Sequence, residues 1–199
     1  MPYLQSQHFR SVQQLNHWLS PKPMKSEGAA VDTLTGLPTL GEFYRAGPAR
    51  VEDCLAKGIA CAVAIIDIDH FRRLVETHGE EAADKIVQAI GARIGAATEG
   101  TPLLLARLDQ EEFGLLLMDI DTIAATEFCD NLRAEIGEEP VLFGDCEISV
   151  TVSVGVAEVC GPETFDNYLN GAEQFLFMAK SYGRNQVLSD HTVALQAVK

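Results

Sequence analysis

Basic residues are scarce in this chain, and that scarcity limits what its surface as a whole can attract. Lys and Arg total 15 against 29 Asp and Glu, which gives a formal net charge of -14 at pH 7. A long-range field of that sign repels nucleic acid and anionic membrane surfaces, so we expect neither as a partner. A single phosphate ligand is not excluded, because a few local cations or a metal ion can hold it.

Paired cysteines and a membrane-spanning apolar run are also missing. The five cysteines form no C-x-x-C pair, and their odd number argues against a disulfide framework or a zinc site. The best apolar run, residues 59–68, has about half the length that a bilayer-crossing helix needs. The N-terminus shows no basic stretch followed by an apolar one, as a leader peptide would. These absences favour a protein of the reducing cytoplasm.

Length and composition predict one ordinary domain with an extension at each end. The chain has 199 residues, of which 47% are hydrophobic and 22% charged, as in a globular domain with its own core. We expect an amphipathic helix and a linker at residues 1–30, a domain at 31–190 and a C-terminal tail at 191–199. The apolar face of the first helix, residues 8–19, either contacts a second chain or another partner, or packs on its own domain.

The order of the apolar segments predicts an α/β sandwich of the α+β class with a central mixed sheet. Strands are expected at 59–68, 103–107, 113–118, 147–159 and 185–188, and helices at 41–57, 69–77, 80–97, 121–136 and 162–182. Five residues, four of them polar, separate the second and third strands, which indicates a hairpin. Gly47 and Pro48 are expected to interrupt the first of these helices.

Two acids follow the apolar run that we expect to be a buried central strand. Asp67 and Asp69 are two residues apart, so they point to the same side, and ligand sites in open sheets lie at the carboxyl ends of strands. A buried carboxylate needs a partner. One interpretation is a Mg²⁺ site, because hard cations take oxygen ligands. The alternative is that an Asp at this junction caps the next helix.

Two further clusters also admit a functional and a structural interpretation. The expected hairpin tip carries Asp109, Glu111 and Glu112, which either hold a metal or form a solvated turn. Lys180 and Arg184 lie four residues apart near the expected end of a helix. They either point at one anion or stabilise the helix C-terminus as cations beside a glycine stop signal.

Taken in order along the chain, these clusters resemble the GGDEF family. The motifs are Asp-x-Leu-Thr-Gly-Leu at 32–37, Asp-x-Asp-x-Phe-Arg at 67–72, Gly79 with Asp84, the hairpin tip at 109–113, Val-Ser-Val-Gly-Val at 152–156 and Ala-Lys-x-x-Gly-Arg-Asn at 179–185. Each motif is weak alone, but their order is specific. The resemblance covers roughly residues 31–188 and implies a mainly antiparallel, mixed five-stranded sheet surrounded by helices, as in nucleotide cyclases.

The resemblance also implies a reaction and a metal. An active family member joins two GTP molecules into cyclic di-GMP, with one GTP on each of two facing domains and metal ions that stabilise the phosphates. The implied Mg²⁺ ligands are Asp67, the backbone carbonyl of Ile68, and Glu111. With Arg72, Glu111 is also a vestigial catalytic candidate. Arg72 stands where the family has lysine, and its planar fork is not equivalent to an ammonium group.

Four side chains match positions that contact the nucleotide in the family. Lys180 and Arg184 match the phosphate-binding pair. Asp84 matches an acid that reads the guanine edge, and Phe71 lies in the matching motif after the central strand. These four residues are therefore the implied nucleotide contacts.

The signature loop departs from the family pattern, because it reads Asp109-Gln110-Glu111-Glu112-Phe113. Two side chains replace the two glycines that let the backbone approach the ligand and adopt positive φ. Asp109 also adds a negative charge near the expected phosphate position. The acidic half of the loop, Glu111 and Glu112, is kept, so a metal can bind even where GTP does not.

Two further departures affect recognition. Val75 stands where the family has an asparagine that reads guanine, and valine offers no hydrogen bond. The family's inhibitory product site, Arg-x-x-Asp, is replaced by Gly100–Leu103 with no charged residue. We therefore expect no inhibitory product site here.

The sequence therefore predicts a degenerate GGDEF protein of bacterial cyclic di-GMP signalling that is catalytically inactive. It would act through a protein partner or through residual nucleotide binding. Two alternatives stay open: an active or weak diguanylate cyclase, and a nucleotide sensor without turnover. Mg²⁺, GTP and a second copy of the chain are further candidate ligands and partners.

Overall fold

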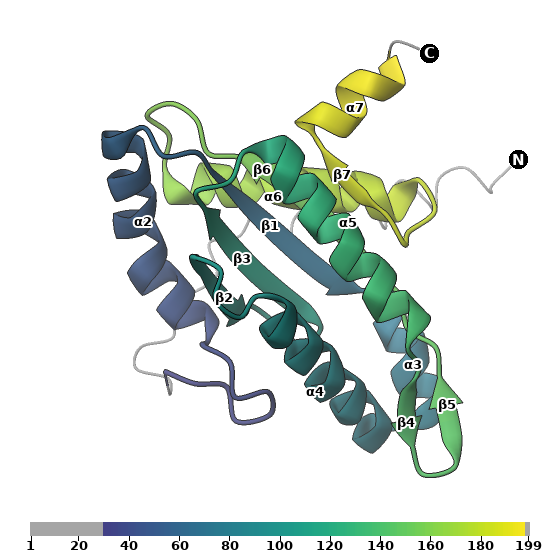
Figure 1. The fold of residues 1–199 in the computed structure, drawn as a ribbon. Coiled ribbons are helices and arrows are strands. Elements are labelled where there is room, and N and C mark those ends of the chain that lie inside the picture. The colour runs from purple at the N-terminus through teal and green to yellow at the C-terminus, as the bar shows by residue number, and fades with distance from the viewer. Residues whose placement is uncertain (1–29, 198–199) are drawn as a thin grey trace, which may run out of the picture.

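The computed structural model describes residues 30–197, with side chains through residue 193. The amphipathic helix and linker expected before residue 30 lie outside these residues. Five strands form one sheet in the order β2-β3-β1-β6-β7, shown in Figure 1. Within the described residues, no helix is long and apolar enough to cross a membrane.

The sheet is antiparallel except at one edge. It consists of β1 (Cys61–Ile68), β2 (Leu103–Arg107), β3 (Glu112–Met118), β6 (Val152–Glu158) and β7 (Val187–Ser189). The central strand β1 pairs antiparallel with β3 and β6, and β2 pairs antiparallel with β3. Only β7 runs parallel to its neighbour, β6. The expected mixed, mainly antiparallel five-stranded sheet is confirmed.

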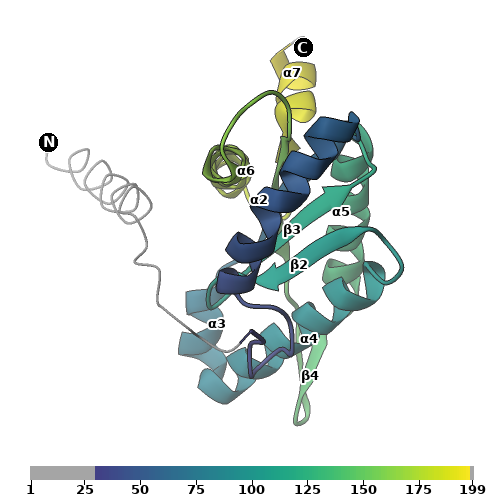
Figure 2. The same cartoon turned by 90° about the vertical axis from the view of Figure 1, so that its left-hand side faces the viewer.

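Helices cover both faces of the sheet. They are α2 (Leu40–Lys57), α3 (Phe71–His78), α4 (Glu80–Ala97), α5 (Thr122–Glu138), α6 (Phe165–Ser181) and α7 (Asp190–Ala197). The core on one face is built by α4 and α5, and the core on the other face by α2 and α6, as Figure 2 shows from the side. The helix α3 follows β1 directly and contacts α4.

All eight residues of β1 are buried, as expected for a central strand covered on both faces. Successive side chains of a strand point to opposite faces. Ala64 and Ile66 join the core beneath α4 and α5, whereas Val63 and Ile65 join the core beneath α6. Asp67 continues the second series, so the strand geometry alone directs its carboxylate toward α6.

Gly155 lets α6 lie directly on the sheet. It pairs with Ile65 of β1, in the middle of β6. A Cβ at this position would overlap the backbone of Ala172 and Leu176 in α6. The close approach of helix and sheet therefore depends on the absence of a side chain at Gly155.

The expected interruption of the first helix is wrong, because α2 continues through Pro48. Phe43 and Val51 lie on either side of the proline and are both buried in the core. Gly47 packs so closely on the ring of Phe165 that a Cβ would overlap it. Core packing across both halves of the helix outweighs the hydrogen bond that proline removes.

Two elements near the C-terminus also differ from expectation. The long strand expected at 147–159 is divided into β5 (Cys146–Ile148) and β6, and β5 pairs with β4 (Val141–Phe143) in a separate small hairpin. The tight turn of that hairpin contains Gly144 at φ 58°, a left-handed conformation that glycine adopts without steric cost. The second difference is α7, which occupies most of the expected tail. Ser189 and Thr192 cap its start, because the backbone N–H of Ser189 donates to Thr192 Oγ1 at 2.7 Å.

Candidate functional site

An ion pair lies where the central strand meets α6. Lys180 Nζ is 2.7 Å from Asp67 Oδ2, and the Asp67 side chain is 6% exposed against 29% for Lys180. Burial raises the pKa of Asp67 to about 6, although Lys180 opposes the rise, and the charges of Glu111 and Asp69 add to it. The carboxylates here therefore exceed the one lysine that neutralises them.

Glu111 joins this group from the β2–β3 turn. Its carbonyl oxygen accepts a hydrogen bond from the backbone N–H of Ile68 at 3.2 Å, which holds the turn beside the end of β1. Burial raises the pKa of Glu111, Lys180 opposes the rise, and Asp109 adds to it. The three residues expected to hold a metal, Asp67, Ile68 and Glu111, are therefore brought to one place.

The donors at this place suit a hard cation. Two carboxylates and a backbone carbonyl are the oxygen ligands that Mg²⁺ prefers. The pKa of Asp67 is raised first of all by burial, which disfavours its ionised form, and a bound divalent cation would stabilise that form. Among the residues that the structure describes, no group of three or more His, Cys, Asp or Glu side chains is arranged to hold a metal ion. A cation here would therefore depend on the carbonyl of Ile68 and on non-protein ligands such as phosphate oxygens.

The signature turn closes without a glycine. Neither Asp109 nor Gln110 has positive φ. The backbone N–H of Gln110 donates to Asp109 Oδ1 at 2.9 Å, and that of Leu108 donates to the carbonyl of Glu112 at 2.8 Å. The turn therefore forms with ordinary backbone angles at the two positions where the family has glycine. Asp109 and Gln110 are both exposed at the tip of the hairpin, so their side chains still occupy space that glycine would leave open.

Arg107 fastens the signature turn to the start of the domain. Its Nε donates to the carbonyl of Asp109 at 3.1 Å and its Nη2 to the carbonyl of Gln110 at 2.7 Å. Its Nη1 donates to both carboxylate oxygens of Asp32, at 3.0 and 3.2 Å. Arg107 was not among the predicted site residues. The available signal was a basic residue at the end of β2, just before the turn.

Asp32 also organises its own turn in the Asp-x-Leu-Thr-Gly-Leu motif. Its Oδ1 accepts from the backbone N–H of Thr35 at 2.8 Å and from the Thr35 hydroxyl at 2.7 Å. Burial alone would raise the pKa of Asp32, but the hydrogen bonds from Thr35 and Arg107 outweigh it and lower that pKa. The first and fourth motifs along the chain are thus joined through one arginine.

The expected phosphate pair is near the site, but its two cations are engaged separately. Lys180 faces Asp67, whereas Arg184 folds back so that its Nη1 donates to the carbonyl of Lys180 at 3.3 Å. The contact of Arg184 is the favourable one for a cation at a helix C-terminus. An anion shared by both side chains would require Arg184 to swing away from the helix.

The remaining predicted residues lie on α3 and α4. Phe71 is half-buried against the core, and Asp84 is exposed on α4. Arg72 points to solvent, with 93% of its side chain exposed and its Nε 3.0 Å from Glu76 Oε1. Val75 is half-buried on α3. Of these four residues, none contacts the Asp67–Lys180 pair through a hydrogen bond or ion pair within the described part of the chain.

Asp69 does not cap α3. The N-cap residue of that helix is His70, which has φ 56° and makes no side-chain capping bond. The Asp69 carboxylate is buried and accepts from Ser153 Oγ at 2.6 Å and from Thr151 Oγ1 at 2.7 Å. It also accepts from the backbone N–H of Asn185 at 3.0 Å. The capping interpretation is therefore wrong for Asp69.

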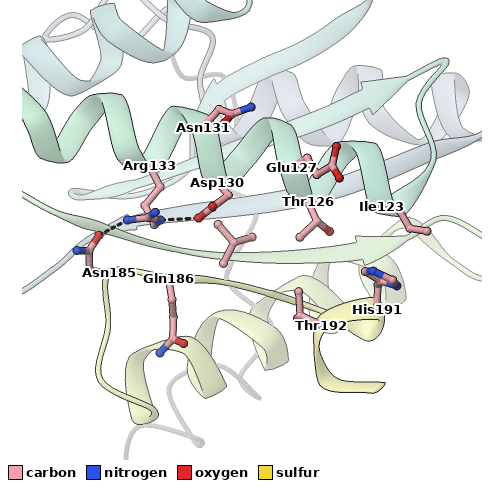
Figure 3. A pocket seen from close by; sticks show the side chains of 11 residues that line it. Ile123, Thr126, Glu127, Asp130, Asn131, Arg133, Asn185, Gln186, His191 and Thr192 are labelled. Atoms are coloured by element: carbon pink, nitrogen blue, oxygen red, sulfur yellow. Dashed lines mark hydrogen bonds and ion pairs between the residues drawn. The ribbon is translucent and has the colours of Figure 1, made fainter. Parts of the chain in front are cut away.

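A groove of about 520 Å³ lies on another part of the molecule, between α5, β7 and the start of α7 (Figure 3). Its walls include Thr126, Asp130 and Arg133 of α5 and His191 of α7. Neither Asp67 nor Lys180 lines it. Asn185, which lies beyond the C-terminus of α6, lines the groove and also donates its backbone N–H to Asp69.

The sheet order, the acids at the end of its central strand and the lysine that faces them define a nucleotide-cyclase-like domain. The family described as "Diguanylate cyclase, GGDEF domain" matches residues 29–186. The chain therefore belongs to the GGDEF family.

Similar proteins support this assignment. Diguanylate cyclase DgcP of Pseudomonas aeruginosa is 31% identical over 163 residues, which cover 80% of this chain and 24% of DgcP. The chain thus spans about a quarter of the length of that relative. Diguanylate cyclase SiaD of Pseudomonas aeruginosa, solved in complex with its activator SiaC, has a TM-score of 0.77 and 26% identity over 94% of this chain and 69% of SiaD. The GGDEF domain of DgcB from Caulobacter crescentus, solved with c-di-GMP, has a TM-score of 0.77 and 24% identity over 82% of this chain and 96% of that domain, a likeness of fold.

Proposed function

We propose that this GGDEF domain keeps the cation- and phosphate-binding half of a nucleotide site, does not make cyclic di-GMP, and signals by binding a protein partner. One observation carries the proposal: Asp67, Glu111 and Lys180 are assembled at the end of β1, while Val75 stands at the position of the guanine-reading asparagine. The residues suited to a cation and a phosphate are thus kept, whereas the guanine-reading asparagine is not.

The phosphate half has a consistent chemistry. Asp67, the carbonyl of Ile68 and Glu111 would hold Mg²⁺, which supplies positive charge to phosphate oxygens when it is bound. Lys180 balances Asp67 in its absence, since its ammonium group is 2.7 Å from that carboxylate. With the acids balanced by a cation, Lys180 is free to donate to a phosphate oxygen.

Changes at the guanine-reading position, at the catalytic candidate Arg72 and in the signature loop all oppose turnover. Val75 cannot hydrogen-bond a guanine edge. Arg72, the catalytic candidate, extends into solvent and pairs with Glu76. Asp109 lies close enough to Glu111 to raise its pKa, so it adds to the negative charge that a triphosphate must meet. Weak binding without positioning does not lower the barrier of a two-substrate reaction.

A protein partner would then carry the output of the domain. The solved complex of SiaD with its activator gives a precedent for protein partners among similar chains. For the present chain we propose the same kind of protein contact, with a second copy of the chain as the alternative partner.

A weak diguanylate cyclase is the second candidate, and a specific observation favours it. The signature turn closes with ordinary backbone angles, so losing two glycines does not distort the strand that follows. Asp67, Glu111 and Lys180 remain in place. A nucleotide sensor without turnover is the third candidate, supported by the same three residues together with the altered base position at Val75.

Product analysis separates these candidates. The full chain is incubated with GTP and Mg²⁺ or Mn²⁺, and cyclic di-GMP is measured by chromatography. Calorimetry with GTP, ATP and cyclic di-GMP measures binding, with Asp67→Ala as the control. We expect weak, Mg²⁺-dependent GTP binding and no product. Steady product formation that is lost in Asp67→Ala overturns the proposal in favour of the cyclase. If none of the three nucleotides binds, only the partner-binding part of the proposal remains.

A further inference from the structure

The segment that follows α6 has an uncommon backbone. Gly183, Arg184 and Asn185 have φ values of 120°, 67° and 46°, so three consecutive residues lie in the left-handed region. Residues other than glycine rarely adopt this region, and they do so when surrounding contacts over-determine the conformation. We call residues 183–185 the left-handed turn. Because this turn carries Arg184 and begins three residues after Lys180, its position bears on where both cations stand.

Asp69 supplies a buried, charged contact to this turn. One carboxylate oxygen accepts from Ser153 Oγ at 2.6 Å, and the other accepts from Thr151 Oγ1 at 2.7 Å and from the backbone N–H of Asn185 at 3.0 Å. Asp69 is only 4% exposed. It lies one residue beyond β1 and two residues from Asp67, so the same stretch of chain holds the acid of the site and the anchor of the turn.

We propose that Asp69 is a positioning residue whose carboxylate fixes the left-handed turn, and with it Arg184 and the end of α6, relative to Asp67. The inference rests on the proposed function, because a phosphate ligand is what Lys180 and Arg184 would hold together. Asp69 itself touches no ligand in this account. It acts through the backbone of Asn185.

The three donors to Asp69 are not equivalent. The hydroxyl groups of Ser153 and Thr151 can donate or accept, whereas the backbone N–H of Asn185 can only donate. An asparagine at position 69 can keep its oxygen toward Asn185 while its amide nitrogen faces Ser153, whose hydroxyl turns to accept. Asp69→Asn therefore keeps the anchor, and Asp69→Ala removes it.

A second contact reaches the turn from α5. Arg133 Nη1 donates to the side-chain oxygen of Asn185 at 2.8 Å, and Arg133 Nε contacts Asp130 Oδ1 at 2.7 Å, as the dashed lines in Figure 3 show. Asn185→Gly removes this contact but keeps the N–H that donates to Asp69 and tolerates positive φ. The glycine variant therefore separates the side-chain contact from the backbone contact.

Hydrogen exchange of individual backbone amides tests the inference without any ligand. Wild type, Asp69→Asn, Asp69→Ala, Asn185→Gly and Ser153→Ala are compared, with the amides of β1 reporting global stability. Loss of a hydrogen bond to a buried charge should speed exchange of the Asn185 amide by about tenfold or more beyond any change in β1. We expect this faster exchange of the Asn185 amide only in Asp69→Ala. Asp69→Ser, which still offers Ser153 a polar partner but is too short to reach Asn185, replaces it if the alanine variant does not fold.

Affinity for GTP in the presence of Mg²⁺, measured by calorimetry, is the second readout. Asp69→Ala should weaken it by about tenfold, while Asp69→Asn, Asn185→Gly and Ser153→Ala bind as wild type does. Wild-type protein that binds no GTP defeats the phosphate-binding part of the proposed function but leaves the exchange test decisive. Unchanged exchange at Asn185 in Asp69→Ala, or exchange that rises in every variant in step with β1, overturns the inference.

Discussion

Lys180 and Asp67 form a 2.7 Å ion pair at the point where the last turn of α6 meets the end of the central strand. The pair joins the residue implied for phosphate to the residue implied for a metal. Its geometry follows from strand alternation, which directs Asp67 toward α6, and from Gly155, which lets the helix lie directly on the sheet. The position of the candidate site thus follows from the packing of α6 on the face of the sheet that it shares with α2.

Replacing Lys180 and replacing Asp67 should lower the free energy of unfolding by unequal amounts. Lys180→Met leaves a buried carboxylate beside Glu111 without its cation and should reduce the free energy of unfolding by about 1–3 kcal/mol. Asp67→Asn removes one acid from a crowded group and should cost less. Urea denaturation of both single variants and the double variant measures the coupling. Equal losses in the two single variants contradict the idea that acids are in excess here.

The contact between Arg107 and the signature turn should support the whole hairpin. Arg107→Met removes four hydrogen bonds and leaves Asp32 without its cation, so we expect a loss of about 1–3 kcal/mol in unfolding free energy. Arg45→Met is the matched control, because Arg45 pairs with Glu42 on the exposed surface of α2 and its loss should go unnoticed. Similar stability losses in the two variants, measured by denaturant unfolding, count against a special role for Arg107.

Asp32 gives the domain a defined response to acid. Its pKa is lowered below the ordinary value of 3.8, so the ionised side chain stabilises the folded state above that value. This stabilisation is lost as pH falls through 3.8 toward the lower pKa of the folded state. The difference in unfolding free energy between wild type and Asp32→Asn should therefore be full near neutral pH and shrink below 3.8. A difference that stays constant down to low pH contradicts this assignment.

Gly155 should tolerate no side chain. Gly155→Ala places a Cβ against the backbone of Ala172 and Leu176, which cannot move without separating helix from sheet, so a loss of about 3 kcal/mol or a failure to fold is expected. Gly137→Ala on α5 is the control, because a Cβ there meets nothing within 4 Å. That control should raise stability by about 0.5–1 kcal/mol. Thermal unfolding of both variants checks the contrast.

The sequence predicted the parts of the fold that depend on local pattern. The apolar run ending in Asp67 is the central strand, and the family motifs locate the acids that meet Lys180. Apolar periodicity could not show that packing of Phe43 and Val51 carries α2 through Pro48, because that balance is set by tertiary contacts.

The remaining misses concern polar side chains with distant partners. Asp69 looked like a helix cap, because its three donors are more than 80 residues away along the chain. Arg107 was overlooked for the same reason, since Asp32 lies 75 residues before it.

Restoring the family residues should restore turnover if their loss is the cause of inactivity. We expect the triple variant Asp109→Gly, Gln110→Gly and Val75→Asn to form cyclic di-GMP above the level of wild type, because it removes the loop charge and side chains and returns a hydrogen-bonding group to the base position. The variant with only the two glycines should gain less. A triple variant that binds GTP tightly and remains inactive would move the cause elsewhere, with Arg72 as the next residue to test.

The most direct measurement is the time course of cyclic di-GMP formation by the full wild-type chain at high protein concentration with GTP and Mg²⁺. Calorimetric GTP binding is recorded on the same preparation, with Lys180→Met as the control. We predict GTP binding that depends on Mg²⁺ and on Lys180, and a product signal no higher than that of Asp67→Ala. Product that accumulates linearly in wild type and disappears in Asp67→Ala contradicts this prediction.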